Sequence, residues 1–179
     1  VVGDCKVTLP AITKLLAEAK HEEWLNSFSE YKAQEDALVV EPAIHPADGP
    51  LLMGEIVNVV AEATGGEAIL VNDVGQNQMF SSRYFRYNKK RSIVTSGGLG
   101  TMGFGMGAAI GANIATNEKT VLVTGDGSFG MNLNELATAV TNKIPLVILM
   151  LNNGVLGMVR QWQTLFFDKH YSNTVLERQ

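Results

Sequence analysis

From Pro50 onward, short apolar runs alternate with longer segments whose apolar residues recur at helical spacing. The runs cover residues 68–72, 92–96, 120–124 and 146–151, and the longer segments cover residues 52–63, 102–115, 133–141 and 156–167. Apolar runs of this length suit strands that are buried on both faces, as in a parallel sheet. The alternation therefore predicts an α/β fold, a doubly wound and mostly parallel sheet with helices on both faces.

The first 48 residues follow a different pattern. Apolar residues at helical spacing predict helices over residues 9–20 and 22–35, and a proline-rich segment that ends at Pro50 then predicts a linker. We therefore expect a short helical linker over residues 1–48 and a ligand-binding domain over residues 49–179. Because Val1 stands in place of an initiator methionine, we also expect the chain to be part of a longer protein.

The composition argues against several classes of partner. The net charge is −4 and the isoelectric point is near 5.4, so the surface would not attract the phosphates of nucleic acids or membranes. No apolar stretch has the length that spans a bilayer. The single cysteine, Cys5, cannot form an internal disulfide, which indicates a reducing compartment, the cytoplasm.

Segments rich in glycine, aspartate and amides follow all four predicted strands. They cover residues 73–77, 97–100, 125–128 and 152–154. Each segment alone is typical of an ordinary turn. In a doubly wound sheet, however, ligands bind beyond the carboxyl ends of the strands. Together the four segments predict a site for a phosphorylated cofactor at that edge.

Two of these segments carry oxygen ligands. Asp126 lies between two glycines, and 24 residues separate Gly127 from Asn152, about the length of one strand–helix–strand step. Asp126 and Asn153 should therefore lie side by side on neighbouring strands. Carboxylate and amide oxygens suit Mg²⁺, which also takes phosphate oxygens. Asn132 and Glu135 resemble a capping box, so we expect the next helix to begin there and face the same phosphates.

An alternative hypothesis is a dinucleotide-binding module. Gly98, Gly100 and Gly103 match the spacing of the Rossmann fingerprint, and Asp126 ends the next strand. This hypothesis gives Asn153 no role and does not explain the glycines that flank Asp126. The three glycines also suit a close-packed helix of small residues.

The Gly-Asp-Gly motif, followed about two dozen residues later by Asn-Asn, resembles the signature of thiamine-diphosphate enzymes. Over residues 50 to 175 the chain resembles the acetolactate synthase (acetohydroxyacid synthase) family, C-terminal thiamine-diphosphate-binding domain. The segments that carry this resemblance are residues 74–79, 95–103, 131–137 and 151–162. Asn77 departs from the pattern, because many members carry histidine there. By the same resemblance, residues 1–48 correspond to the end of a middle domain and the linker that follows it.

The resemblance implies a role for each matching residue. Asp126, Asn153 and the main-chain carbonyl of Val155 would bind magnesium. Gly100 and Met102 would be catalytic by holding the cofactor in its reactive shape, and Met158 and Trp162 would form the substrate pocket. The implied cofactor-binding set is Gly75, Gln76, Asn77, Gly100, Met102, Gly125, Asp126, Gly127, Ser128, Asn153, Val155, Gly157 and Met158. Met102 and Trp162 would also suit ordinary core positions.

The resemblance also implies the reaction and the partners. Thiamine diphosphate and Mg²⁺ would act on pyruvate, which is decarboxylated, and its two-carbon unit would be joined to a second 2-keto acid in the biosynthesis of valine, leucine and isoleucine. The family's activating glutamate lies on a pyrimidine-binding domain of a partner subunit in a homodimer, and a regulatory subunit can join. FAD binds the full-length family members but would not bind this chain alone. We therefore expect the chain alone to be inactive.

Other decarboxylases and oxidases that use thiamine diphosphate share the metal motif. The Gly157-Met158 and Gln161-Trp162 pairs favour acetolactate synthase.

Overall fold

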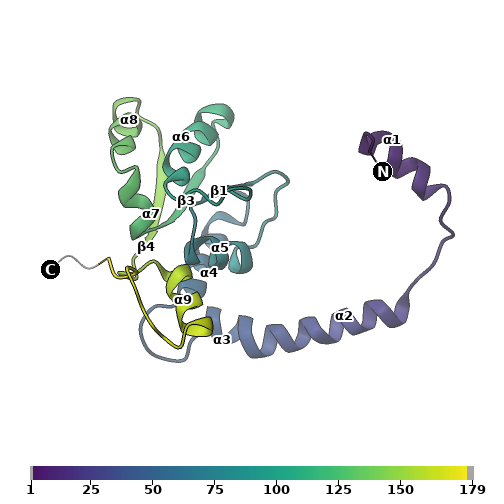
Figure 1. Ribbon diagram of the computed structural model, residues 1–179. Helices are drawn as coiled ribbons and strands as arrows, with labels where there is room; N and C mark the ends of the chain where they lie inside the picture. The colour runs from purple at the N-terminus through teal and green to yellow at the C-terminus, as the bar shows by residue number, and fades with distance from the viewer. Residues whose placement is uncertain (1, 177–179) are drawn as a thin grey trace. The chain divides into compact units, whose positions relative to one another are not determined.

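The computed structural model describes residues 2–176, which divide into one unit up to Val39 and a second unit from Val40 (Figure 1). The first unit contains helix α1 (Cys5–Thr13), helix α2 (Glu22–Glu35) and most of a π-helical turn, η1 (Asp36–Val40). Its described residues are exposed or half-buried. The prediction of a helix over residues 9–20 is wrong, because the Asp4 side chain accepts a hydrogen bond from the Lys6 N–H and starts the helix earlier.

The second unit is built on a four-stranded parallel sheet. Its strands are β1 (Ile69–Asn72), β2 (Ile93–Thr95), β3 (Thr120–Gly125) and β4 (Leu146–Leu151), in the order β2-β1-β3-β4. In β1, Val71 is in register with Val94 of β2 and Leu122 of β3. All four carboxyl ends therefore meet at one edge, and the predicted doubly wound α/β fold is confirmed.

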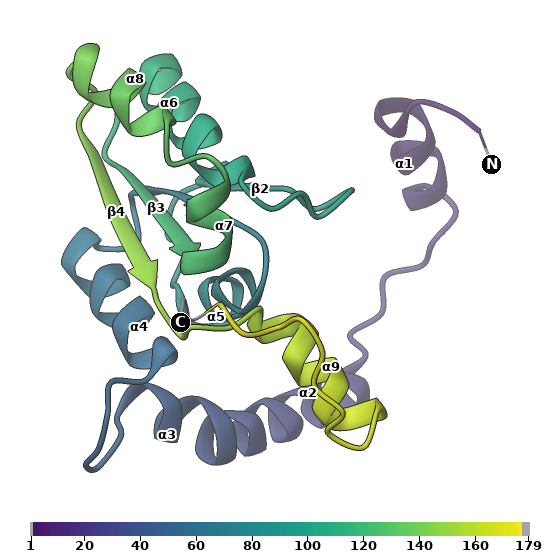
Figure 2. The same cartoon turned by 60° about the vertical axis from the view of Figure 1, so that its left-hand side comes forward.

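Helices cover both faces of this sheet. The helices of this unit are α3 (Glu41–Ile44), α4 (Met53–Thr64), α5 (Gln76–Tyr84), α6 (Phe104–Thr116), α7 (Asp126–Met131), α8 (Glu135–Thr141) and α9 (Gly157–Phe166). Leu70 and Val121 pack with the α3, α4 and α5 side, whereas Val71 and Leu122 pack with the α6 and α8 side. Figure 2 shows α6 and α8 on one side of β3 and β4 and α4 on the other. Successive strand residues thus supply two separate cores.

Three features of the helices differ from the sequence-based expectation. Helices α5 and α7 lie in segments for which no helix was predicted. The capping-box prediction is wrong: α8 begins at Glu135 after Asn134, without a side-chain cap, and the Asn132 amide donates instead to the Gly103 carbonyl at 2.6 Å. Within the expected linker, Ile44 of α3 is buried in the core beside Val57. The functional division into residues 1–48 and 49–179 stays a prediction.

The helices are short. Across residues 2–176, none combines the length and the apolar character that crossing a bilayer requires.

Candidate functional site

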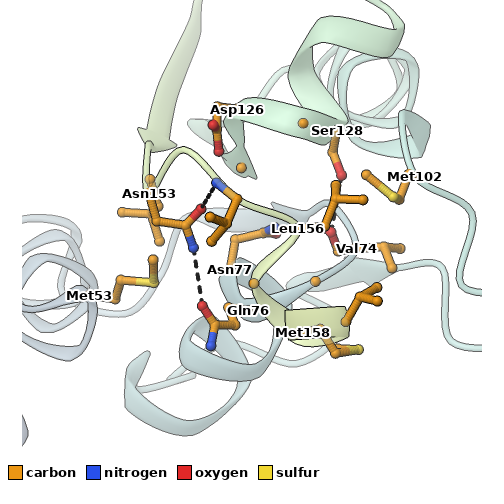
Figure 3. A pocket seen from close by; sticks show the side chains of 17 residues that line it. Met53, Val74, Gln76, Asn77, Met102, Asp126, Ser128, Asn153, Leu156 and Met158 are labelled. Atoms are coloured by element: carbon orange, nitrogen blue, oxygen red, sulfur yellow. Dashed lines mark hydrogen bonds between the residues drawn. The ribbon is translucent and has the colours of Figure 1, made fainter. Parts of the chain in front are cut away.

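A cleft opens at the carboxyl edge of the sheet (Figure 3). The loops after β1, β3 and β4 supply most of its walls, and Met53 of α4 closes one side. Twelve of the residues implied by the resemblance line it: Gly75, Gln76, Asn77, Met102, Gly125, Asp126, Gly127, Ser128, Asn153, Val155, Gly157 and Met158. Parallel pairing explains this convergence, because it brings the ends of distant strands together.

Asp126 and Asn153 follow neighbouring strands, as predicted. Gly125 of β3 is in register with Leu151 of β4, so both loops leave the sheet at the same level. Figure 3 shows the two side chains on the same side of the cleft. The Asn153 amide nitrogen donates to the Gln76 side-chain oxygen at 3.1 Å. Because the nitrogen of the Asn153 amide faces Gln76, the oxygen of the same amide faces away from Gln76.

The backbone of Val155 is held by a short antiparallel contact. Val155 forms an isolated bridge with Val175. The two hydrogen bonds of this bridge come from the flanking residues, at 2.8 Å each: Leu156 N–H to Thr174 C=O, and Leu176 N–H to Gly154 C=O. In such a pair the N–H and C=O of the bridged residue point away from the partner segment. The Val155 carbonyl is therefore directed away from residues 174–176 and is available to a ligand.

The floor of the cleft is polar and buried. Asn77 is 4% exposed and its amide nitrogen donates to the Val74 carbonyl at 3.1 Å, whereas its amide oxygen is buried without a partner among the described residues. The Ser128 hydroxyl donates to the same carbonyl at 3.0 Å. A buried oxygen without a partner is costly, and only a hydrogen-bond donor or a cation would satisfy it.

A side chain at three of the cleft glycines would clash with neighbouring residues. A Cβ on Gly157 would lie 2.2 Å from the Gln76 oxygen, and one on Gly125 would lie 3.2 Å from the Asn77 amide nitrogen. A Cβ on Gly127 would lie 3.0 Å from Leu176. Glycine at these positions therefore lets the side chains around the cleft pack against the backbone.

The donor set fits magnesium bound to a diphosphate. One carboxylate, from Asp126, is joined by the amide oxygen of Asn153 and the carbonyl of Val155, all hard oxygen donors. No group of three or more His, Cys, Asp and Glu side chains gathers anywhere in residues 2–176, so a site rich in such ligands is not found there. The apolar side of the cleft is formed by Met53, Val74, Met102, Leu156 and Met158. Of these, Met53 lies outside the segments that carry the resemblance, whereas Val74 and Leu156 lie within them, although the resemblance implies no role for either.

Two predicted residues lie outside the cleft. Gly100 is exposed, with φ +60°, in the loop before α6. Trp162 is 59% exposed and contacts Phe166, with ring centroids 5.1 Å apart, in a separate groove along α9. This exposure does not suit a core residue, so the alternative of a core role for Trp162 is not supported. Met102, which would also suit a core position, lines the cleft, and its methyl group lies 3.5 Å from a Cβ built on Gly127.

Comparison with known families agrees with this geometry. Residues 73–178 match the family described as "Thiamine pyrophosphate enzyme, C-terminal TPP binding domain". The chain belongs to this family. The matched region begins directly after β1 and includes every loop that lines the cleft. Thiamine diphosphate, also called thiamine pyrophosphate, is the cofactor of the family.

Several relatives of this chain within the family are acetolactate synthases. The chain is 36% identical to the acetolactate synthase large subunit of Buchnera aphidicola subsp. Schizaphis graminum over 182 residues. It is 35% identical to the acetolactate synthase isozyme 3 large subunit of Escherichia coli over 185 residues. Each match covers 99% of this chain and 31% of the relative. An acetolactate synthase of Mycobacterium bovis is 47% identical over 131 residues, 73% of this chain and 21% of that protein. The chain thus spans about a third of the length of its full-coverage relatives.

The dinucleotide hypothesis is not favoured. Gly98 and Gly100 are exposed and contribute nothing to the cleft, and they follow β2, the edge strand of the sheet. A dinucleotide fingerprint would place these glycines against the bound pyrophosphate. The family match likewise assigns the region to thiamine diphosphate.

Proposed function

We propose that this chain forms the diphosphate- and magnesium-binding half of an acetolactate synthase active site. The observation that carries the proposal is the convergence of Asp126, Asn153 and the Val155 carbonyl above a buried, glycine-rich floor at one sheet edge. The similarity to acetolactate synthases over 99% of the chain supports the choice of reaction within the family.

Each part of the cleft has a distinct task. Asp126, Asn153 and the Val155 carbonyl would hold Mg²⁺, whose positive charge would offset the negative charges of Asp126 and of the diphosphate. Gln76 orients the Asn153 amide, and Asn77 and Ser128 form the polar floor under the phosphates. The Met102 side would shield the cofactor from water. Thiamine diphosphate, when bound, supplies the carbon nucleophile for decarboxylation of a 2-keto acid, so the protein's task is positioning.

The proposal includes partners and substrates that lie beyond this chain. The substrates are pyruvate and a second 2-keto acid, and Met158 and Trp162 would face the second one. A pyrimidine-binding domain of a partner subunit in a homodimer would supply the activating glutamate. The relatives are named large subunits, so a smaller regulatory subunit is a further partner. Residues 1–48 would be the end of an FAD-binding middle domain and its linker, in a cytoplasmic enzyme.

Titration calorimetry tests the cofactor assignment. Thiamine diphosphate should bind with Mg²⁺ and lose most of its affinity in EDTA, whereas NAD should not bind under either condition. Binding of NAD, or magnesium-independent binding of thiamine diphosphate, would refute the assignment.

An assay with pyruvate tests whether this chain supplies only half of the active site. Asp126 is the one ionisable side chain that lines the described cleft, and it would be occupied by the metal. The 179-residue chain alone should therefore bind cofactor without forming acetolactate. Turnover comparable to a complete synthase would contradict the half-site.

A further inference from the structure

Asp73 is a buried carboxylate outside the cleft. It is 1% exposed and follows β1 directly. In the described part of the chain, no lysine, arginine or histidine forms an ion pair with it. Its partners are the N–H groups of Val74 (2.9 Å), Gly103 (3.0 Å) and Gly105 (3.2 Å), and the Thr124 hydroxyl (3.4 Å), whose single hydrogen is shared with the Gly125 carbonyl at 3.2 Å. A carboxylate is the side chain best suited to accept from so many donors at once.

Asp73 provides the cap that helix α6 lacks in its own sequence. The N-cap residue of α6 is Gly103, with φ +84° and no side chain to accept from the first turn. Asp73 accepts from the N–H groups of Gly103 and Gly105, two of the donors that a helix leaves unpaired at its start. A Cβ on Gly105 would lie 2.9 Å from the Asp73 oxygen, so glycine permits this approach.

One of the four partners lines the cleft, and two others are next to residues that line it. Val74 lines the cleft itself, Gly103 follows Met102, and Thr124 precedes Gly125. The contacts therefore join the loops after β1 and β2 to the end of β3. We infer that Asp73 is a positioning residue, whose carboxylate holds Val74, Met102 and Gly125 in the arrangement that binds the cofactor; this inference rests on the proposed function.

The peptide between Met102 and Gly103 connects the Asp73 carboxylate to the cleft. Gly103 is buried, its N–H donates to Asp73, and its carbonyl accepts from Asn132 at 2.6 Å. Loss of the Asp73 acceptor would leave a buried N–H without a partner, which is costly enough to move the loop. Met102, one residue away, would move with it.

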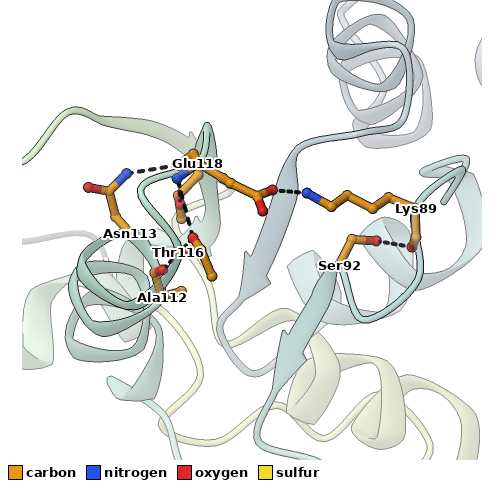
Figure 4. Close-up of polar contacts among 7 residues, drawn as sticks. Lys89, Ser92, Ala112, Asn113, Thr116 and Glu118 are labelled. Atoms are coloured by element: carbon orange, nitrogen blue, oxygen red, sulfur yellow. Dashed lines mark hydrogen bonds and ion pairs between the residues drawn. The ribbon is translucent and has the colours of Figure 1, made fainter.

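Asp73→Asn is the test substitution, and Thr120→Val is its matched control. Asn keeps the shape of Asp but presents an NH₂ group to donors. Thr120 is 1% exposed and lies at the opposite end of β3, where its hydroxyl donates to the Glu118 carbonyl at 3.1 Å. That end of the sheet also carries the Lys89–Glu118 ion pair (Figure 4). The control thus removes a buried hydrogen bond far from the cleft.

Two measurements on the 179-residue chain decide the inference. In Asp73→Asn, the Gly103 and Gly105 amides should exchange hydrogen at least about tenfold faster than the loss of global stability explains. Affinity for thiamine diphosphate with Mg²⁺ should fall at least about tenfold. In Thr120→Val, hydrogen exchange at the Gly103 and Gly105 amides should rise only as far as the loss of global stability explains. Its affinity for thiamine diphosphate should stay within about twofold of the parent's.

Other outcomes are equally clear. Unchanged affinity in Asp73→Asn, with or without faster exchange, would overturn the positioning role and leave a structural one. If the parent chain does not bind thiamine diphosphate, the proposed function fails, and exchange at Gly103 and Gly105 still decides whether Asp73 holds the loop. If Asp73→Asn does not fold, Thr124→Val, which removes one donor from the same carboxylate, is measured in the same way and must show the same direction.

Discussion

The amide nitrogen of Asn153 donates to the side-chain oxygen of Gln76 at 3.1 Å, although the two residues are 77 positions apart in the chain. This contact joins the loop after β4 to the first turn of α5. Since the nitrogen is engaged by Gln76, the amide oxygen is the atom that remains for the Val155 N–H and for a cation. A neutral pair of amides thus selects which atom of Asn153 can act as a metal ligand.

Gly157→Ala should break this arrangement with little effect on stability. The new Cβ would lie 2.2 Å from the Gln76 oxygen and 2.8 Å from the Asn153 nitrogen, and both are ends of side chains that can move. We expect cofactor affinity to fall about tenfold by calorimetry, in line with the 10–100-fold effects of residues that orient metal ligands. The control is Gly107→Ala in α6, where nothing lies within 4 Å. It should stabilise the chain by about 0.5–1 kcal/mol and leave the affinity unchanged. Equal affinities for both variants would contradict the role of Gln76.

Asp126→Asn should abolish magnesium-dependent binding of the cofactor. The substitution keeps the shape but removes the one negative charge of the described cleft lining. The affinity should fall by more than about 100-fold, beyond the range for residues that only orient ligands. A magnesium titration at fixed thiamine diphosphate measures this. Asp168→Asn, which changes a carboxylate outside the cleft, should titrate like the parent. Retained binding in Asp126→Asn would remove the residue from the metal site.

Trp162→Leu should separate substrate choice from cofactor binding. Trp162 is 59% exposed and does not line the cofactor cleft, so stability should change by less than about 0.5 kcal/mol and cofactor affinity should be unaltered. In the assembled enzyme, the preference for 2-ketobutyrate over pyruvate as acceptor should weaken about tenfold. Competition between the two acceptors gives this ratio, and Leu165→Ala on the same helix is the control. An unchanged product ratio would assign Trp162 no part in acceptor choice.

Tyr87 should make the fold sensitive to alkaline pH. Burial raises the pKa of Tyr87 to about 12, and its hydroxyl donates to the Ser81 carbonyl at 3.2 Å. Because this folded-state pKa exceeds the ordinary value near 10, the contribution to stability is complete below pH about 10 and is lost as pH rises through about 12. Denaturant unfolding at several pH values should show a shallower decline in Tyr87→Phe than in the parent. Tyr31→Phe, at a residue that is 69% exposed, should retain the parental slope.

The sequence predicts the sheet well because each strand contains consecutive apolar residues, from two in β2 to six in β4. It does not reveal α5, whose buried face consists of Asn77, Ser81 and Tyr84, so its segment has no apolar periodicity. Helix α7 is six residues long and contains two glycines, so its segment shows no helical periodicity either. Where burial is polar or an element is short, tertiary contacts decide the structure.

The cleft was predictable to the extent that it consists of local motifs. The Gly-Asp-Gly and Asn-Asn segments are recognisable in the sequence, and the structure brings them together. Asp73 was not recognisable in this way, since its partners Gly103, Gly105 and Thr124 lie 30, 32 and 51 positions away. A role that depends on three strands meeting has no signature in any one segment.

The bridge between Val155 and Val175 makes the orientation of one proposed magnesium ligand, the Val155 carbonyl, depend on a segment that supplies no proposed ligand itself. Because the Val155 carbonyl is aimed by the hydrogen bonds of its neighbours to residues 174 and 176, a change in that outer segment would tilt the carbonyl without altering any ligand. Two proteins with identical metal-binding residues could therefore hold magnesium with different strength. Selection for tighter or looser retention of the cofactor can act on residues 174–176 without changing any proposed ligand.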